Sequence, residues 1–275
     1  MTRIAVVSIG KMGEAIARRL VMGGAEVMTS FEGRSEATRA RAEAGGITGA
    51  SEAEIAGADI FLSIVPPSTA RAMAERYLPL FAAQAHPPVY VDCNAIAPDT
   101  SREIGALFAA EGLPFADGGI IGGPKWEGPG LPRLYVSGTG PELAETLAGH
   151  GLDCRHLSDM PGEASELKMS YAGLTKGFQA LGATMALAAD RPALRERLLA
   201  ELEGSQPMLY GWLSRMLPGM YAKAYRWEGE MEEIAAFLAS RGLDPRFFEA
   251  AAALYGQIAT DEEKVAAIDR FVTRR

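Results

Sequence analysis

Short apolar runs alternate with stretches of helical spacing through the first half of the chain. Apolar runs typical of buried strands occupy Ile4–Val7, Glu26–Thr29, Ile60–Val65, Val89–Val91, Phe115–Asp117 and Arg133–Ser137. Helical spacing is found at Lys11–Met22, Glu36–Ala44, Ser68–Phe81 and Thr100–Glu111. The repetition of strand, helix and strand predicts an α/β fold with a parallel sheet covered on both faces.

The pattern changes near Met160-Pro161-Gly162, beyond which strand signals nearly vanish. Glu163–Ala189 is expected to form one long, alanine-rich helix. Further helices, separated by Gly, Pro and Asp, are expected at Pro192–Glu203, Pro207–Met216, Glu228–Ser240 and Pro245–Phe271. We therefore expect two domains, an α/β domain over residues 1–160 and an all-α domain over residues 161–275.

Composition narrows the class of protein. Of the 275 residues, 48% are hydrophobic and 23% charged, so the chain can bury a core. The net charge of −8 argues against broad binding to nucleic acid or anionic membrane. The longest weakly polar run, Ala180–Ala189, is shorter than the ~20 residues of a membrane helix. Two cysteines and an interrupted apolar start favour a cytoplasmic protein without a secretory signal, and the three scattered histidines predict no metal site.

The loop after the first strand carries the clearest chemical signal. It consists of Ser8, Ile9, Gly10, Lys11, Met12 and Gly13, and a helix follows at once. In the dinucleotide-binding fingerprint, three glycines permit a tight turn, a close pyrophosphate and close helix packing. Gly10 and Gly13 take the second and third positions, whereas Ser8 takes the first. We interpret the loop as the cofactor-binding turn of a Rossmann domain with a doubly wound sheet; a purely structural turn is the alternative.

The segment after the second strand bears on the choice of cofactor. Arg34 has the geometry to bind a 2′-phosphate, with a hydroxyl from Ser35 or Ser30 beside it. Glu32 has the chemistry to accept a hydrogen bond from a free 2′-hydroxyl instead. We favour NADP and keep NAD as the alternative, and an ordinary solvated loop would imply neither.

Further segments match one family in order along the chain. They are Asp59–Pro66, Val91–Pro98, Asp117–Pro124 and Gly162–Lys168. Together with Gly10-Lys11-Met12-Gly13, they resemble the β-hydroxyacid dehydrogenase and 6-phosphogluconate dehydrogenase-like superfamily over roughly residues 1–180. Arg34-Ser35 and Leu174–Gly177 are similar to a divergent bacterial phosphogluconate-dehydrogenase-like subgroup.

The resemblance implies roles for particular residues. Val65, Pro66 and Asn94 would lie beside the cofactor, and Ile121, Gly122 and Gly123 would form the substrate loop. Lys168, on the long interdomain helix, would be the catalytic lysine, and the protein would be a homodimer. Two positions depart from the family pattern: Ile121 replaces a serine and Ala172 replaces an asparagine. A standard small β-hydroxyacid is therefore not implied.

The lysine has a chemical rationale of its own. An amine within hydrogen-bond reach of a hydroxyl or carbonyl oxygen can manage the proton of the reaction, and burial lowers its pKa toward neutrality. On a helix, Lys168, Ala172, Thr175 and Gln179 share one stripe, with Tyr171 beside it. We expect Lys168 to be the general acid/base, with Tyr171 or Thr175 orienting the substrate. The alternative is a helix lysine that faces solvent.

These features predict an NAD(P)-dependent oxidoreductase that interconverts a hydroxyl and a carbonyl on a small polar, acidic metabolite. Contributions from Lys176, Lys125 and Trp126 stay open. One rival is an NADPH-dependent imine reductase of the same architecture, although the retained Lys168 favours alcohol chemistry. The other rival is a cofactor-binding sensor without turnover.

Overall fold

The computed structural model describes residues 1–273, and the chain divides into two compact units between Lys168 and Met169. This division lies later than the expected boundary at residue 160. The reason is that the first turns of helix α7 (Glu163–Ala188) belong to the sheet-containing unit, where the Ser165 backbone N–H donates to Asp117 at 2.8 Å. The long expected helix exists, but the division between the units falls inside it.

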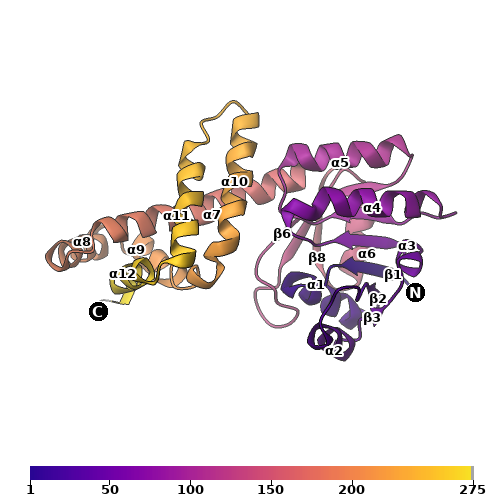
Figure 1. Ribbon diagram of the computed structural model, residues 1–275, viewed down its shortest axis with the longest axis horizontal. Helices are drawn as coiled ribbons and strands as arrows, with labels where there is room; N and C mark the ends of the chain where they lie inside the picture. Colours follow the sequence, from indigo (N-terminus) through magenta and orange to yellow (C-terminus); the bar gives the residue numbers. More distant parts are fainter. Residues whose placement is uncertain (274–275) are drawn as a thin grey trace. The chain divides into compact units, whose positions relative to one another are not determined.

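The first unit contains an eight-stranded sheet in the order β3-β2-β1-β4-β5-β6-β7-β8 (Figure 1). The strands are β1 (Arg3–Val7), β2 (Glu26–Thr29), β3 (Thr48–Gly49), β4 (Ile60–Ser63), β5 (Val89–Asp92), β6 (Phe115–Ile121), β7 (Arg133–Ser137) and β8 (Asp153–Ser158). The strands β1 to β6 are parallel, whereas β7 runs antiparallel to β6 and β8 runs parallel to β7. The sheet is therefore mostly parallel, as expected, with a single antiparallel pairing between β6 and β7. A loop without a helix joins β6 to β7, and a parallel return needs a longer crossover.

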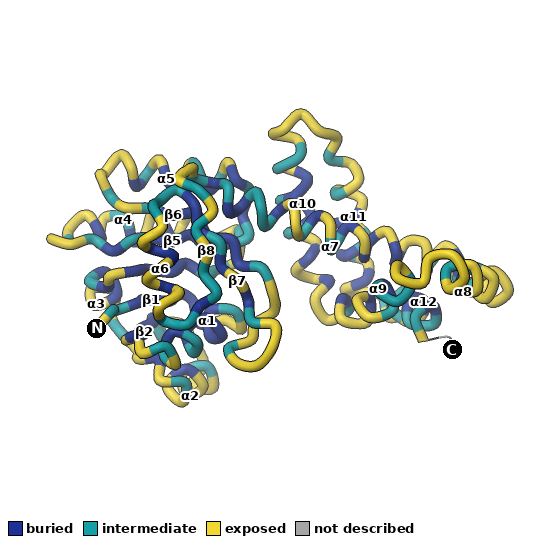
Figure 2. The backbone as a smooth tube through the Cα atoms, turned by 180° about the vertical axis from the view of Figure 1, so that it is seen from behind, coloured by how far each residue is buried: buried dark blue, intermediate teal, exposed yellow. Residues whose placement is uncertain are grey.

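Helices cover both faces of this sheet (Figure 1). One face carries α1 (Lys11–Met22), α2 (Glu36–Ala44) and α6 (Glu142–Gly149). The other carries α3 (Glu52–Ala56), α4 (Ala70–Ala82) and α5 (Pro98–Ala110), with the short 3₁₀ helix η1 (Pro67–Thr69) before α4. Figure 2 shows the central strands as buried and the outer helix surfaces as exposed. This is the doubly wound α/β architecture that the repeating pattern predicts.

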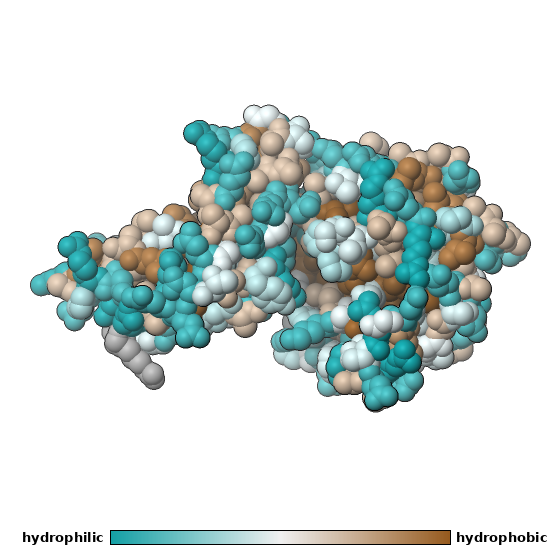
Figure 3. Space-filling view, viewed as in Figure 1, coloured by the Kyte–Doolittle hydropathy of each residue, from teal (hydrophilic) through white to brown (hydrophobic). Residues whose placement is uncertain are grey.

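The order of the strands locates a binding crevice. The chain leaves β1 through α1 on one face and leaves β4 through α4 on the other, while β1 and β4 are neighbours. Ligands of open α/β sheets bind outside the carboxyl ends of strands at such a switch point. In the space-filling view, hydrophobic residues gather near the middle of the visible face of this unit, with hydrophilic residues around them (Figure 3).

The second unit is helical. After the rest of α7 come α8 (Pro192–Ser205), α9 (Pro207–Met216), the 3₁₀ helix η2 (Tyr221–Lys223), α10 (Ala224–Ser240), α11 (Arg246–Thr260) and α12 (Glu262–Thr273). The segment Pro245–Phe271, expected to be helical, forms two helices. They divide at Asp261, whose backbone is extended and whose carboxylate accepts from the N–H groups of Glu263 and Lys264. Among residues 1–273, no helix combines the length and apolar character needed to cross a membrane.

Candidate functional site

The loop between β1 and α1 has the geometry of an anion-binding turn. Gly10 precedes α1 with an extended backbone, and no side chain caps the helix there. A Cβ at Gly10 would meet nothing within 4 Å, so its outer side is open. A Cβ at Gly13 would lie 1.9 Å from the Ser8 carbonyl oxygen, so only glycine allows the helix to approach the strand this closely. The amides of the first turn of α1 are left for an anionic ligand.

The other loop residues have different surroundings. Ser8 and Ile9 are buried, and Ile9 packs in the core beneath α1. Lys11 is exposed, and Met12 packs partly against the same core. The Ser8 backbone N–H donates to the Ile64 carbonyl at 3.3 Å, which ties the glycine loop to the segment after β4.

A hollow of about 930 Å³ opens beyond β2 and β3, where the doubly wound fold places an adenosine ribose. Glu32 lines it and pairs with Arg76 at 2.6 Å, and Arg76 also reaches Glu52 at 2.5 Å. The Arg34 side chain makes no hydrogen bond or ion pair with any of residues 1–273, whereas the Ser35 hydroxyl accepts from the Thr38 N–H and so caps α2. The Glu32 carboxylate is thus paired, whereas the Arg34 guanidinium group is available to a ligand.

Asn94 connects the loops after β4 and β5. Its side-chain oxygen accepts from the Val65 N–H at 2.6 Å, and its side-chain amide donates to the Ser63 hydroxyl at 3.0 Å. Its backbone N–H donates to Asp92 at 3.0 Å, and its carbonyl oxygen accepts from the Lys168 amine at 3.0 Å. Three residues predicted to form the site, Val65, Asn94 and Lys168, are therefore joined in one hydrogen-bonded network. Pro66 is exposed and precedes η1.

The Lys168 side chain is partly buried, and its surroundings act on the pKa of the amine in opposite directions. Burial lowers the pKa of its ammonium group, while the charges of Asp92 and Asp117 oppose that shift. Gly119 in β6 allows α7 to pack closely against the sheet. A Cβ at residue 119 would lie 2.5 Å from the Ala164 carbonyl oxygen and 3.4 Å from the Lys168 Cβ. The first turns of α7 can therefore lie directly on the sheet.

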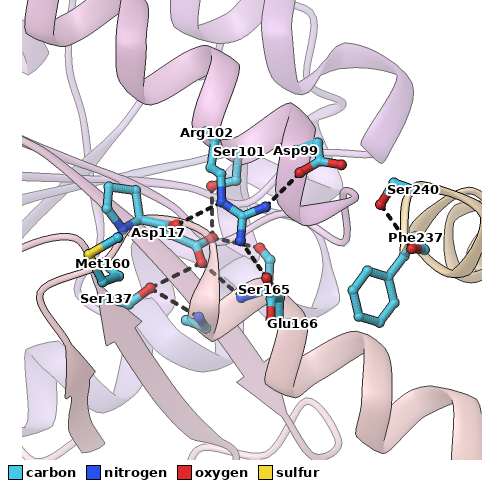
Figure 4. Close-up of polar contacts among 12 residues, drawn as sticks. Asp99, Ser101, Arg102, Asp117, Ser137, Met160, Ser165, Glu166, Phe237 and Ser240 are labelled. Atoms are coloured by element: carbon cyan, nitrogen blue, oxygen red, sulfur yellow. Dashed lines mark hydrogen bonds and ion pairs between the residues drawn. The ribbon is translucent and has the colours of Figure 1, made fainter. Parts of the chain in front are cut away.

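A buried carboxylate fixes this end of α7 (Figure 4). Asp117 accepts hydrogen bonds from the hydroxyls of Ser101, Ser137 and Ser165 at 2.9, 3.2 and 2.6 Å. It also accepts from the Ser165 N–H at 2.8 Å, at the positive end of the helix dipole. Since Asp117 is fully buried, these four donors compensate the loss of its hydration.

An arginine braces the same helix start from outside. Arg102 on α5 donates to the Pro161 carbonyl at 3.2 Å, and it pairs with Asp99 at 2.6 Å and with Glu166 on α7. Figure 4 shows this group beside the Asp117 cluster. The Asp117 cluster and the Arg102 contacts thus position the first turn of α7, directly before Lys168.

The predicted substrate loop begins where β6 ends. Ile121 is partly exposed, and Gly122 has a φ of +129°, where a Cβ would also lie 2.9 Å from the Pro132 Cα. Gly123 is exposed with open space around it. In the same loop Lys125 folds back to the Pro129 carbonyl at 3.2 Å, and Arg18 of α1 lies 4.9 Å above the Trp126 ring.

The remaining candidates lie on the part of α7 that belongs to the second unit. The Tyr171 side chain is half-exposed, and the Thr175 hydroxyl donates to the Tyr171 carbonyl at 2.9 Å. The Lys176 amine pairs with Glu230 and lies 5.2 Å from the centre of the Trp227 ring. These contacts give Lys176 a packing role within the helical unit.

Asp92 and Asp117 belong to the family-like segments Val91–Pro98 and Asp117–Pro124, but the sequence alone assigns neither residue a role. Asp92 is the last residue of the buried strand β5, and a polar residue in that place is a signal that points to it. Asp117 lies inside β6, where an acid within an apolar run is the available signal. In the sheet register Ser63 pairs with Asp92, and Asp92 pairs with Asp117. Among residues 1–273, no group of three His, Cys, Asp or Glu side chains could hold a metal ion.

Comparison with known proteins gives two family matches. The NAD-binding domain of 6-phosphogluconate dehydrogenase matches residues 3–146, and a domain of unknown function (DUF1932) matches residues 189–258. An uncharacterised 28.5 kDa protein of Methanothermus fervidus is 27% identical over 247 residues, which cover 88% of this chain and 93% of that protein. The 3-hydroxyisobutyrate dehydrogenase of Pseudomonas aeruginosa is 29% identical over 166 residues, 58% of this chain and 55% of the enzyme.

Solved structures agree with these matches. A conserved protein of unknown function, described as structurally similar to 3-hydroxyacid dehydrogenases, has a TM-score of 0.75 at 30% identity. The match covers 96% of this chain and 99% of that one. An imine reductase from Myxococcus stipitatus, solved with NADP⁺, shares the fold at a TM-score of 0.57 and 16% identity, over 99% of this chain and 100% of its own.

Proposed function

Because the chain belongs to the family defined by the NAD-binding domain of 6-phosphogluconate dehydrogenase, we propose that it is an NAD(P)-dependent dehydrogenase acting on a hydroxyl group of a small polar, acidic metabolite. The observation that carries the proposal is the Lys168 amine, held 3.0 Å from the Asn94 carbonyl oxygen at the carboxyl ends of the strands. A nicotinamide ring bound there would exchange a hydride with the substrate carbon.

The chain's own part of this chemistry is the proton. In the oxidative direction the neutral Lys168 amine accepts the proton of the substrate hydroxyl, and in the reductive direction the ammonium group donates it to the carbonyl oxygen. Burial lowers the pKa of this group below its ordinary value, which favours the neutral amine that the oxidative direction needs. The bond to Asn94 leaves the other positions of the amine for the substrate. Tyr171 or Thr175, further along the same helix, is proposed to orient that substrate.

The cofactor would be held by two features already described. The amides at the start of α1, bordered by Gly10, suit a pyrophosphate. Arg34, free of side-chain partners among residues 1–273, suits a 2′-phosphate, while pairing with Arg76 leaves Glu32 a weaker acceptor for a 2′-hydroxyl. We therefore propose NADP as the preferred cofactor.

A second copy of the chain is the proposed partner. Five half-exposed apolar side chains recur along α7 at alternating spacings of three and four residues: Tyr171, Leu174, Phe178, Leu181 and Met185. Leu174, Phe178 and Leu181 of this set also line an apolar groove of about 320 Å³, together with residues that include Gly173, Gly177 and Phe248. One face thus offers both protruding side chains and a groove, which is what a two-fold symmetric interface requires.

Both cysteines are free thiols, which suits the reducing cytoplasm where we propose that the protein acts.

A turnover assay tests the proposal. NADP⁺ would be offered with a panel of hydroxyacids and sugar acids, and NADPH with a panel of cyclic imines, each followed by nicotinamide absorbance. We expect at least one hydroxyacid to be oxidised, with tighter binding of NADPH than of NADH by fluorescence titration. Turnover of imines alone would contradict the alcohol chemistry. Tight cofactor binding without turnover on either panel would favour the sensor role instead.

A further inference from the structure

Asp92 is a buried carboxyl group that the proton chemistry above does not use. It ends β5 with 1% of its surface exposed, beside Ser63 of β4 and Asp117 of β6 in the sheet register. One carboxylate oxygen accepts the Asn94 N–H at 3.0 Å, and the other finds no partner among residues 1–273. A buried oxygen without a donor is costly when it carries charge, so a structural role alone gives no reason for an acid here.

The position of Asp92 relative to Lys168 supplies a reason. Asn94 lies between the two side chains, since its N–H donates to Asp92 and its carbonyl accepts from the Lys168 amine. We propose that Asp92 is a positioning residue for the proposed reaction: its buried carboxylate holds the Asn94 turn under the Lys168 amine and stabilises the charged form of that amine. This inference rests on the proposed function of Lys168.

Three other ionisable groups lie near Asp92 and Lys168: Asp117, Cys93 and Tyr90. Asp117 on β6 is saturated by four donors that fix the start of α7. Burial raises the pKa of the Cys93 thiol and of the Tyr90 phenol well above their ordinary values, so both stay neutral near pH 7. Burial also raises the pKa of the Asp92 carboxyl group to about 7, so this group is mainly charged above pH 7.

Two substitutions separate the charge of Asp92 from its hydrogen bond. Asp92→Asn keeps an acceptor for the Asn94 N–H and removes the charge, whereas Asp92→Ala removes both. Asp59→Asn is the matched control, because Asp59 is exposed before β4, at the opposite end of the strands. The readout is the pH dependence of Lys168 modification by trinitrobenzenesulfonate, followed by peptide mass spectrometry, which requires no turnover.

We expect the midpoint of Lys168 modification to fall by about one pH unit or more in Asp92→Asn and Asp92→Ala, and to stay unchanged in Asp59→Asn. At a pH below the midpoint this means a roughly ten-fold more reactive amine. The acidic limb of the oxidative pH profile should move by the same amount, with a further loss of kcat in Asp92→Ala alone. An unchanged midpoint in both Asp92 variants would overturn the proposal.

A reciprocal measurement covers the case in which both Asp92 variants fail to fold. The carboxyl carbon of Asp92 would be titrated by NMR in the wild-type protein and in Lys168→Met. Because coupling between two groups acts equally in both directions, the Asp92 midpoint should rise when the amine is removed, and equal midpoints would overturn the proposal. A shifted amine titration in a protein without turnover would instead overturn the proposed function and leave this coupling standing.

Discussion

At the scale of single residues, the two glycines of the first loop have opposite reasons for being glycine. Gly13 has no room for a side chain, because the Ser8 carbonyl occupies the space, whereas Gly10 borders open space. Steric demand inside the protein therefore explains one glycine. For Gly10 we propose a different reason, a ligand that approaches its backbone.

This difference predicts separate effects of two substitutions. Gly13→Ala should lower the free energy of unfolding by about 2 kcal/mol, since the loop must move away from the new Cβ. Gly10→Ala should leave stability unchanged and weaken NADPH binding roughly ten-fold, since a methyl group lifts the pyrophosphate from the amides (~1.4 kcal/mol). Urea unfolding and fluorescence titration measure the two effects. Equal cofactor affinity in Gly10→Ala and wild type would contradict the assignment of the loop.

Asp92 gives the protein a pH-dependent stability. Burial raises the pKa of its carboxyl to about 7, above the roughly 3.9 of an unfolded chain, so the native state binds this proton more tightly. The resulting stabilisation is complete below about pH 4 and is lost as the pH rises through about 7. The amide side chain of the Asp92→Asn variant does not ionise in this pH range. We expect its stability relative to wild type to increase by a few kcal/mol between pH 4 and pH 8 in urea unfolding. A difference that stays constant across this range would refute the account.

At the scale of elements, the start of α7 is the decisive structure. Four hydrogen bonds to Asp117 and the Arg102 contacts hold its first turn on the sheet, and Gly119 allows it to approach. The position of Lys168 therefore depends on contacts made one turn earlier. Removal of the anchor should release the helix end while the sheet stays folded.

Asp117→Ala tests this anchor. It leaves three hydroxyls and one N–H without their acceptor, so we expect a loss of about 3 to 5 kcal/mol in the free energy of unfolding. Hydrogen exchange should accelerate in residues 163–168 more than in β1 or β4. As a control, Asp159→Ala removes an exposed acid that pairs with His156, and it should change neither quantity appreciably. Uniform acceleration across the whole first unit would contradict a local anchor.

Elements with local signals were predictable from the sequence. The α1, α2 and α9 bounds follow from apolar spacing and from Gly or Pro at their ends, and the structure confirms them. The edge strand β8 was missed because its partly exposed residues form no apolar run.

Within the candidate site, Lys168 and Asn94 could be proposed from the sequence because they lie in segments that resemble the family's motifs. The Asp117 cluster was not, because its serines lie 16, 20 and 48 residues away and converge only in the folded chain.

At the scale of the whole molecule, the exposed stripe on α7 bears on assembly. Soluble monomers rarely expose five large apolar side chains in one row, and knob-and-groove surfaces of this kind associate with a second helix. The stripe spans residues 171–185, about 21 Å of helix. The proposed homodimer would bury it against its own copy.

Charged substitutions in this stripe should separate the copies. We expect the wild-type protein to sediment at twice the 29.2 kDa mass of the chain, and Leu174→Glu with Phe178→Glu to sediment at the single mass. Met208→Glu, at an exposed apolar residue outside the stripe, is the control and should remain dimeric. A monomeric wild-type protein at micromolar concentration would contradict the proposed interface.

The most direct test of the central claim is the turnover of Lys168→Ala with a substrate that the wild-type protein oxidises. The account predicts a fall in kcat of about 100-fold or more with an unchanged affinity for NADPH, since the substitution removes the proton acceptor and leaves the glycine loop intact. Lys223→Ala, which removes an exposed lysine at the start of α10, should keep full activity. A Lys168→Ala protein whose kcat stays within a few-fold of the wild-type value would contradict the account.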